Sequence, residues 1–365
     1  MSLVLVLVAL HLGVLALVAA NAATMARSRR RRAPADGVRV SVLVPARNEE
    51  ANLERLLPTL LAQDLPNAEF IVVDDASEDG TARVLAAFAA RDPRLTPVAG
   101  SGPPPGWVGK VHALYQATRR ATGDLYVFLD ADAELADAGA LRRLAERWAA
   151  AGGAGNAVTG LPRYRDRGPA ALLTSLVPFA VLAALPVWLV PRTRQASLGA
   201  LNGQIWLLGA DDYRRLEPHD ALRDEVLEDV MIGRYLKRQG VRLWFVDLAG
   251  EVAVEMYRSW GEAWAGFRKN AYLLAGGSPL AFALFFAAYG LWWVVPAAMP
   301  LVAGAAGWWP VLTLCAVKLA IDRIGRFPLW VSALAPLTLA AGAALQLASA
   351  LAHRRGTVAW KGRTV

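Results

Sequence analysis

Hydrophobic residues gather in three parts of the chain. Residues 2–24 form one long apolar run, a shorter apolar block covers 170–190, and almost everything after 279 is apolar. A run of about 20 apolar residues is long enough to cross a bilayer as a helix. The pattern predicts an N-terminal transmembrane anchor (1–26), a soluble-type domain (36–270), a C-terminal transmembrane region (279–352) and a basic tail (353–365).

Short apolar strands alternate with amphipathic helices from Val38 onward. The expected strands are VRVSVLVPA, EFIVVDDAS and DLYVFLDAD, and the expected helices cover 49–63, 81–90 and 110–119. Strands of near-continuous Val, Ile and Leu separated by helices predict a parallel sheet covered on both faces. Ligands of such α/β sheets gather at the carboxyl ends of the strands, and here each of the three strands ends in a polar cluster.

The N-terminal apolar run has features of a secretory signal peptide, because Ala20-Asn21-Ala22 offers the small residues of a cleavage site. No basic residue precedes the run, and the block RSRRRR follows it at once. This charge asymmetry favours a membrane anchor that leaves everything after Arg27 in the cytoplasm. The expected location is the cell membrane, with several crossings and a cytoplasmic central domain.

The apolar block at 170–190 is broken by Pro178 and Pro186. A single crossing here would place Asp130 and the later acidic pair at 228–229 on opposite sides of the membrane. We therefore expect a helix at the membrane interface, while a buried pair of core helices explains the pattern equally well. Later apolar stretches lie at roughly 280–303, 308–321 and 328–352, and the number of crossings stays open because the middle stretch is short.

Composition changes this picture little. Of the 365 residues, 55% are hydrophobic and 19% are charged, and the formal net charge is +8. Much of the arginine excess lies beside the apolar segments, where basic residues orient membrane helices, so we expect no nucleic-acid partner. The single cysteine, Cys315, excludes an intramolecular disulfide and a cysteine-based zinc site, and the four histidines lack zinc-ligand spacing.

Asp130 and Asp132 follow the third expected strand on alternate residues. Two carboxylates so placed can hold one hard cation, which in turn can neutralise a diphosphate. A lone D-x-D also occurs as a turn or a helix cap. The position at a strand end favours a divalent metal site, for Mg²⁺ or Mn²⁺.

Asp75 ends the second expected strand. A carboxylate at this place can accept a hydrogen bond from a base or from a ribose hydroxyl. Ser77 and Asp79 explain the same cluster as caps of the following helix, and both functions are compatible.

Two other polar positions stand at the beginnings of expected helices. Lys110 follows a glycine and is suited to contact a phosphate, although the spacing of a P-loop is absent. Glu228 and Asp229 either complement the dipole of their helix or provide a general base, Asp229, for an acceptor hydroxyl.

Six motifs occur in order along residues 38–270: VPARNEE, VVDDASEDGT, WVGK, LDADAE, LNGQIWLLGADDYRRL and EDVMIGRYLKRQG. This ordered set resembles the inverting glycosyltransferases of family 2. The pieces PPGWVGK and WKGR make the chain most similar to bacterial membrane members, the hopanoid-associated and carotenoid glycosyltransferases. The resemblance implies a GT-A fold, an α/β architecture with a mostly parallel nucleotide-binding sheet, and a nucleotide-sugar donor.

By matching motifs, the resemblance also implies roles for individual residues. The implied substrate contacts are Pro45, Arg47, Glu49, Val73, Asp75, Lys110, Asp130 and Glu228. Asp132 is implied as the main metal ligand, Asp130 as a second ligand that also faces the ribose, and Asp229 as the base. The Q-x-x-R-W motif of many membrane members is missing, and its nearest counterpart, MYRSW, makes Arg258 and Trp260 the expected diphosphate contacts.

Together these features predict transfer of a hexose, with inversion, from a nucleoside-diphosphate sugar such as UDP-glucose to a hydroxyl of a membrane lipid such as an isoprenoid. The expected partners are the donor, the lipid acceptor and the membrane. One alternative is a polyprenyl-phosphate sugar synthase, whose phosphate nucleophile needs little help from Asp229. Another is an inactive membrane scaffold that has kept the fold.

Overall fold

The computed structural model describes residues 2–357, 359–360 and 363–364, and the chain divides into two compact units. The sheet unit joins residues 24–163 with 188–255. The helical unit joins 1–23, 164–187 and 256–365.

Strands and helices alternate along the sheet unit. Its strands are β1 (Val40–Ala46), β2 (Glu69–Asp75), β3 (Leu95–Gly100), β4 (Leu125–Leu129), β5 (Ala133–Leu135), β6 (Asn156–Leu161), β8 (Ile205–Gly209), β9 (Arg242–Asp247) and β10 (Val252–Val254), with β7 (Arg163–Tyr164) at the unit boundary. Its helices are α2 (Glu50–Leu61), α3 (Thr81–Ala89), α4 (Gly109–Thr118), α5 (Ala140–Ala151), α8 (Ala210–Leu216), α9 (Pro218–Ala221) and α10 (Glu228–Arg238), with the short turns η1 (Val190–Arg192) and η2 (Ala196–Leu198).

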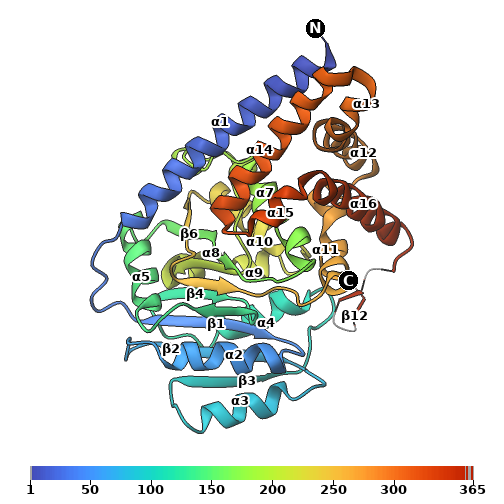
Figure 1. The fold of residues 1–365 in the computed structure, drawn as a ribbon. Coiled ribbons are helices and arrows are strands. Elements are labelled where there is room, and N and C mark those ends of the chain that lie inside the picture. The colour runs from blue at the N-terminus through green and yellow to red at the C-terminus, as the bar shows by residue number, and fades with distance from the viewer. Residues whose placement is uncertain (1, 358, 361–362, 365) are drawn as a thin grey trace. The chain divides into compact units, whose positions relative to one another are not determined.

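Among the described residues, seven strands form one sheet in the order β3-β2-β1-β4-β8-β6-β9 (Figure 1). Strand β8 runs antiparallel to β4 and β6, and the other pairings are parallel. The predicted α/β class with a mostly parallel sheet is therefore confirmed. Because β2, β1 and β4 are neighbours, their carboxyl ends lie side by side and bring three polar clusters to one edge of the sheet.

The central strands are apolar because both of their faces are covered. Val42 and Val44 of β1, Val72 of β2 and Val127 of β4 have no exposed surface. Helix α4 packs on β1 and β2, and α5 packs on β6. The observed helices α2, α3 and α4 begin and end within two residues of the expected positions.

Strand β3 adds one strand to the three that the sequence pattern predicts before the paired aspartates. The apolar pattern does not predict β3, so the paired aspartates follow the fourth strand of the chain and not the third. Strand β3 lies at the edge of the sheet, most of its side chains are at least partly exposed, and it contains Pro97. Edge strands lack a continuous apolar run and tolerate proline, which explains why the pattern misses it.

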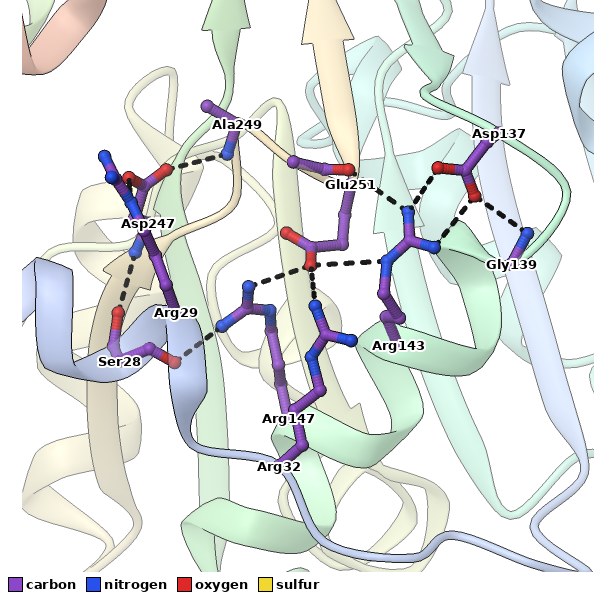
Figure 2. A network of polar contacts seen from close by, with 11 residues as sticks. Ser28, Arg29, Arg32, Asp137, Gly139, Arg143, Arg147, Asp247, Ala249 and Glu251 are labelled. Carbon is purple, nitrogen blue, oxygen red and sulfur yellow. Dashed lines mark hydrogen bonds and ion pairs between the residues drawn. The ribbon is translucent and has the colours of Figure 1, made fainter.

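The last seven residues of helix α1 (Leu3–Arg30) belong to the sheet unit. There a network of ion pairs holds part of the arginine block at residues 27–32 (Figure 2). Arg29 Nε lies 2.5 Å from Asp247 Oδ2, and Arg32 lies 3.5 Å from Glu251 Oε1. Arg147 donates to Glu251 at 2.8 Å and to the carbonyl oxygen of Ser28 at 2.8 Å. Since the side chains of Asp247 and Glu251 are only 3% and 1% exposed, part of the arginine block pairs with buried carboxylates of the sheet unit.

The same network reaches the small sheet beside the metal motif. Glu251 directly precedes β10, and its carbonyl oxygen accepts a 2.9 Å hydrogen bond from the N–H of Ala136. Strand β10 pairs antiparallel with β5, which begins one residue after Asp132. The ion pairs of Figure 2 thus support the strand that follows the paired aspartates.

The helical unit contains the apolar segments. Its helices, besides most of α1, are α6 (Ala170–Thr174), α7 (Leu176–Leu182), α11 (Trp260–Leu274), α12 (Pro279–Tyr289), α13 (Met299–Ala303), α14 (Trp308–Gly325), α15 (Leu329–Ala333) and α16 (Ala335–Arg354). Three short segments of other helix types lie between its α-helices: the π-helix η3 (Gly290–Val294) and the 3-10 helices η4 (Val295–Ala298) and η5 (Gly304–Gly307). Near the C-terminus, β11 (Ala359–Trp360) pairs with β12 (Arg363–Thr364).

Among the described residues, three helical runs are long and apolar enough to cross a membrane: Leu3–Arg30, Pro279–Gly325 and Ala335–Arg354. Apolar helices therefore lie at both ends of the chain, as predicted. The block at 170–190 forms the short helices α6 and α7 within the helical unit, and its interfacial position stays a prediction. The predicted basic tail lies partly outside the described residues, which omit 358, 361–362 and 365 and so interrupt the WKGR motif.

Candidate active site

The side chain of Lys110 joins two acidic groups at the polar edge of the sheet. Its Nζ atom lies 2.8 Å from Oδ1 and 3.0 Å from Oδ2 of Asp130, and 3.0 Å from Oε1 of Glu228. Lys110 is the second residue of α4, Asp130 follows β4 directly, and Glu228 begins α10. Three residues singled out in distant parts of the sequence are therefore in contact.

Burial alone would lower the pKa of the Lys110 ammonium. The carboxylates of Asp130 and Glu228 outweigh that effect and raise its pKa well above the usual value. The ammonium therefore stays charged, and it can serve as a cation for a phosphate group.

Two backbone N–H groups hold the carboxylate of Asp229. Its Oδ2 accepts a 3.0 Å hydrogen bond from Gly203, and its Oδ1 accepts one of 2.8 Å from Val230. Burial, followed by the nearby charge of Glu228, raises the pKa of Asp229 to about 6. A carboxyl group with such a pKa is a better proton acceptor near neutral pH than an ordinary aspartate.

The loop before β8 links Asp130 to Asp229, although the sequence analysis assigns none of its residues to the site. The N–H of Asp130 donates to the carbonyl oxygen of Gln204 at 3.2 Å, while the preceding residue, Gly203, donates to Asp229. A Cβ atom at Gly203 would lie 2.9 Å from Asp229 Oδ2, so the approach requires glycine. In the sequence, the glycine between Asn202 and Gln204, directly before an apolar strand, is the feature that could have indicated this close approach.

The loops after β1 and β2 are bonded into one layer. Arg47 Nη1 donates to the carbonyl oxygens of Asp75 and Ala76, at 2.9 and 2.7 Å. The N–H of Asn48 donates to Ser77 Oγ at 2.9 Å. Asn48 and Ala76 have φ angles of 51° and 53°, a strained conformation for alanine that this bonded layer stabilises.

The predicted nucleotide residues lie on or beside this layer. Pro45 is within β1, Asp75 ends β2 and is 4% exposed, and the side chain of Val73 is fully buried in β2. Glu49 follows β1 and accepts a 2.6 Å hydrogen bond from Asn52. Their contact with a nucleotide stays a prediction.

Asp132 stands between β4 and β5. Its carbonyl oxygen accepts a 3.1 Å hydrogen bond from the N–H of Glu255, whose carboxylate forms an ion pair with Arg55. Within the described part of the chain, no group of three or more His, Cys, Asp and Glu side chains could by itself hold a metal ion.

Arg258 and Trp260 belong to the helical unit and not to the sheet unit. Trp260 begins α11 and packs against the cluster of Tyr164, Ala171 and Phe327, and the N–H of Arg258 donates to Glu262 at 3.0 Å. Their predicted contact with a diphosphate stays a prediction.

The sheet and the polar edge define a GT-A type of nucleotide-sugar fold. Residues 41–188 match the model of glycosyl transferase family 2, the family that the ordered motifs resemble.

The comparisons with known proteins agree with this assignment. The chain is 26% identical over 235 residues to 4,4'-diaponeurosporenoate glycosyltransferase of Staphylococcus haemolyticus (strain JCSC1435), a match that covers 60% of this chain and 57% of that protein. It is 26% identical over 245 residues to the protein of the same name from Staphylococcus aureus (strain USA300), covering 66% and 62%. The chain thus spans less than two thirds of the length of these relatives.

Among solved structures, the chain is similar to a mannosyltransferase of Pyrobaculum calidifontis in complex with GDP-Man and Mn²⁺. The TM-score is 0.55 at 22% sequence identity, covering 95% of this chain and 99% of that one. This likeness supports the fold, and the predicted GT-A fold class is confirmed.

Proposed function

We propose that the protein is an inverting, metal-dependent glycosyltransferase that moves a hexose from a nucleoside-diphosphate sugar to a hydroxyl of a membrane lipid. The observation that carries the proposal is the contact of Lys110 with Asp130 and Glu228, next to Asp229. It gathers the Lys110 ammonium, two carboxyl groups and a base of raised pKa at the edge where α/β sheets bind nucleotides. UDP-glucose is the proposed donor.

The residues present fit a divalent cation of the Mg²⁺ or Mn²⁺ kind. Such ions are often held by one or two carboxylates and by substrate phosphates, without a cage made wholly of protein ligands. Both oxygens of Asp130 lie within 3.0 Å of Lys110, which supports the proposal that Asp132 is the main ligand and Asp130 a weaker one. When bound, the ion would neutralise charge on the diphosphate.

The side chains of the site have different roles in the transfer. The acceptor oxygen attacks the anomeric carbon while the bond from that carbon to the diphosphate oxygen breaks, which inverts the configuration. Asp229 accepts the proton of the acceptor hydroxyl. Lys110 places its positive charge toward the departing nucleoside diphosphate, which leaves with the bonding electron pair. Pro45, Arg47, Glu49, Val73 and Asp75 form the nucleotide pocket.

A lipid acceptor is supported by two observations. Three helical runs among the described residues are apolar enough to span a membrane. The relatives are named after 4,4'-diaponeurosporenoate, which supports an isoprenoid-type acceptor; because that name denotes a carboxylate, the hydroxyl acceptor does not rest on it. In the proposed arrangement the catalytic domain faces the cytoplasm and the chain crosses the membrane several times.

The test uses the full chain in detergent with UDP-glucose, with and without Mn²⁺, and lipids extracted from cells that lack the protein. We expect metal-dependent donor binding by calorimetry and a lipid that gains one hexose in mass spectra. Failure of every nucleotide sugar to bind, with or without metal, would overturn the proposal. Glycosylation of lipid phosphates alone would contradict the hydroxyl acceptor.

A further inference from the structure

The side-chain amide of Gln204 is buried without hydrogen bonds. The residue is 5% exposed, and neither its amide nitrogen nor its amide oxygen has a partner within the described part of the chain. Native proteins seldom keep such groups, because an unpaired polar group in the interior destabilises the fold. A ligand that completes these bonds would explain why the residue is not apolar.

The strand register places this amide beside the acidic edge. Phe128 on β4 and Trp206 on β8 are directly opposite each other, and their rings stack with centroids 3.8 Å apart. Side chains alternate along strands, so the next pair on the same face is Asp130 and Gln204. The 3.2 Å hydrogen bond from the N–H of Asp130 to the carbonyl oxygen of Gln204 shows that these two residues are paired.

The residue before Gln204 contacts the proposed base. Gly203 donates its N–H to the carboxylate of Asp229 at 3.0 Å. Gln204 therefore stands between Asp130, which contacts Lys110, and Asp229, which is to receive the acceptor proton. With the diphosphate at Lys110 and the acceptor hydroxyl at Asp229, as the proposed function has them, the transferred sugar would lie beside Gln204.

We propose that the side-chain amide of Gln204 binds hydroxyl groups of the transferred sugar and so selects the donor, an inference that rests on the proposed function. A primary amide offers two donor hydrogens and one acceptor oxygen, which complement hydroxyls that both donate and accept. A buried site that bonds a hydroxyl discriminates strongly against a ligand that lacks it, because its own polar groups are then left unpaired.

Access to the amide requires a side chain to move, since both of its polar atoms are enclosed by protein. Binding of the donor and exposure of the amide are therefore coupled.

Gln63 provides a matched control in the same unit. It is 4% exposed, and its amide nitrogen donates to the carbonyl oxygens of Thr59 and Asp137, each at 2.8 Å. Its amide oxygen accepts from the N–H of Leu141 at 2.8 Å. The two glutamines are equally buried and differ in whether the protein satisfies their amides.

The experiment compares Gln204→Leu with Gln63→Leu in the full chain. We expect Gln204→Leu to raise Tm by about 2–4 °C, because it removes an unpaired polar group, and Gln63→Leu to lower it. In calorimetry, Gln204→Leu should leave the affinity for UDP within about twofold of wild type and weaken that for UDP-glucose about tenfold. Gln63→Leu, studied below its Tm, should keep the wild-type ratio of the two affinities.

Other results would overturn the inference in distinguishable ways. A fall in Tm for Gln204→Leu and for the similarly shaped Gln204→Met would show that the amide supports the fold. An unchanged ratio of UDP-glucose to UDP affinity would remove the contact with the sugar, and an equal loss for both ligands would assign the amide to the nucleotide. Absence of nucleotide binding by the wild type would refute the proposed function and the inference with it.

Discussion

The Oδ2 atom of Asp229 accepts a 3.0 Å hydrogen bond from the backbone N–H of Gly203. The contact fixes the carboxylate at the start of α10 against the loop before β8, and it requires that residue 203 have no side chain. The loop therefore belongs to the site although it carries no ionisable group. Its geometry decides where the proposed base can reach.

Replacement of Gly203 by alanine is expected to slow transfer more than it weakens donor binding. The new Cβ would displace the Asp229 carboxylate, and a misplacement of about 1 Å can lower a rate about a hundredfold. We expect kcat to fall about tenfold to a hundredfold while the donor Kd stays within about threefold. Steady-state kinetics and calorimetry measure the two quantities.

Gly250→Ala is the control for this experiment, since a Cβ there meets nothing within 4 Å and the residue does not have a left-handed φ. It should behave as wild type. Equal losses of kcat and donor affinity in Gly203→Ala would mean that the loop supports the nucleotide and not the base.

The rate of transfer is expected to rise with pH through a midpoint near 6. Burial and the charge of Glu228 raise the pKa of Asp229 to about 6, and the carboxyl group accepts a proton only when ionised. In Glu228→Gln the like charge is gone, so the acidic limb should move to lower pH. A pH profile of kcat that keeps its midpoint in Glu228→Gln would contradict this origin of the shift.

Removal of the Lys110 ammonium is expected to weaken donor binding strongly. Lys110→Met leaves Asp130 and Glu228 without their shared cation, and their negative charge then opposes the donor diphosphate. We expect the donor Kd to rise about tenfold or more, while Lys110→Arg, which keeps the charge, loses less. Calorimetry with UDP tests this, and equal effects of the two substitutions would show that shape matters more than charge.

The arginine block after α1 is expected to stabilise the sheet unit. Glu251→Gln removes the buried charge on which Arg32 and Arg147 converge in Figure 2, and breaking a buried ion pair costs about 3–5 kcal/mol. We expect a lower Tm and faster trypsin cleavage after residues 29–32. Arg27→Gln, an exposed member of the same block, should change neither. Unaltered cleavage in Glu251→Gln would show that these pairs do not hold the block.

The sequence predicts the parts of the fold that depend on local pattern. Strands β1, β2 and β4 are visible because both faces are buried, which makes their residues uniformly apolar. Strand β3 is missed because an edge strand with half-exposed side chains and Pro97 lacks that pattern.

The residues of the site show the same difference between local sequence pattern and tertiary contact. A carboxylate at an element end is common by itself. Asp130, Asp132 and Asp229 are recognisable because they occur within ordered motifs. The contact between Lys110 and Glu228 joins residues far apart in the chain, and the unpaired amide of Gln204 is a property of tertiary burial that no local pattern carries.

The most direct test of the account compares wild type with Asp229→Asn in transfer from UDP-glucose to extracted lipid in the presence of Mn²⁺. The substitution keeps the shape of the side chain and removes its ability to accept a proton. The account predicts a donor Kd within about twofold of wild type and a transfer rate lowered by about 10²–10⁴-fold. Transfer that survives in Asp229→Asn would contradict Asp229 as the base and indicate an acceptor that is already ionised, a phosphate or a carboxylate, which needs none.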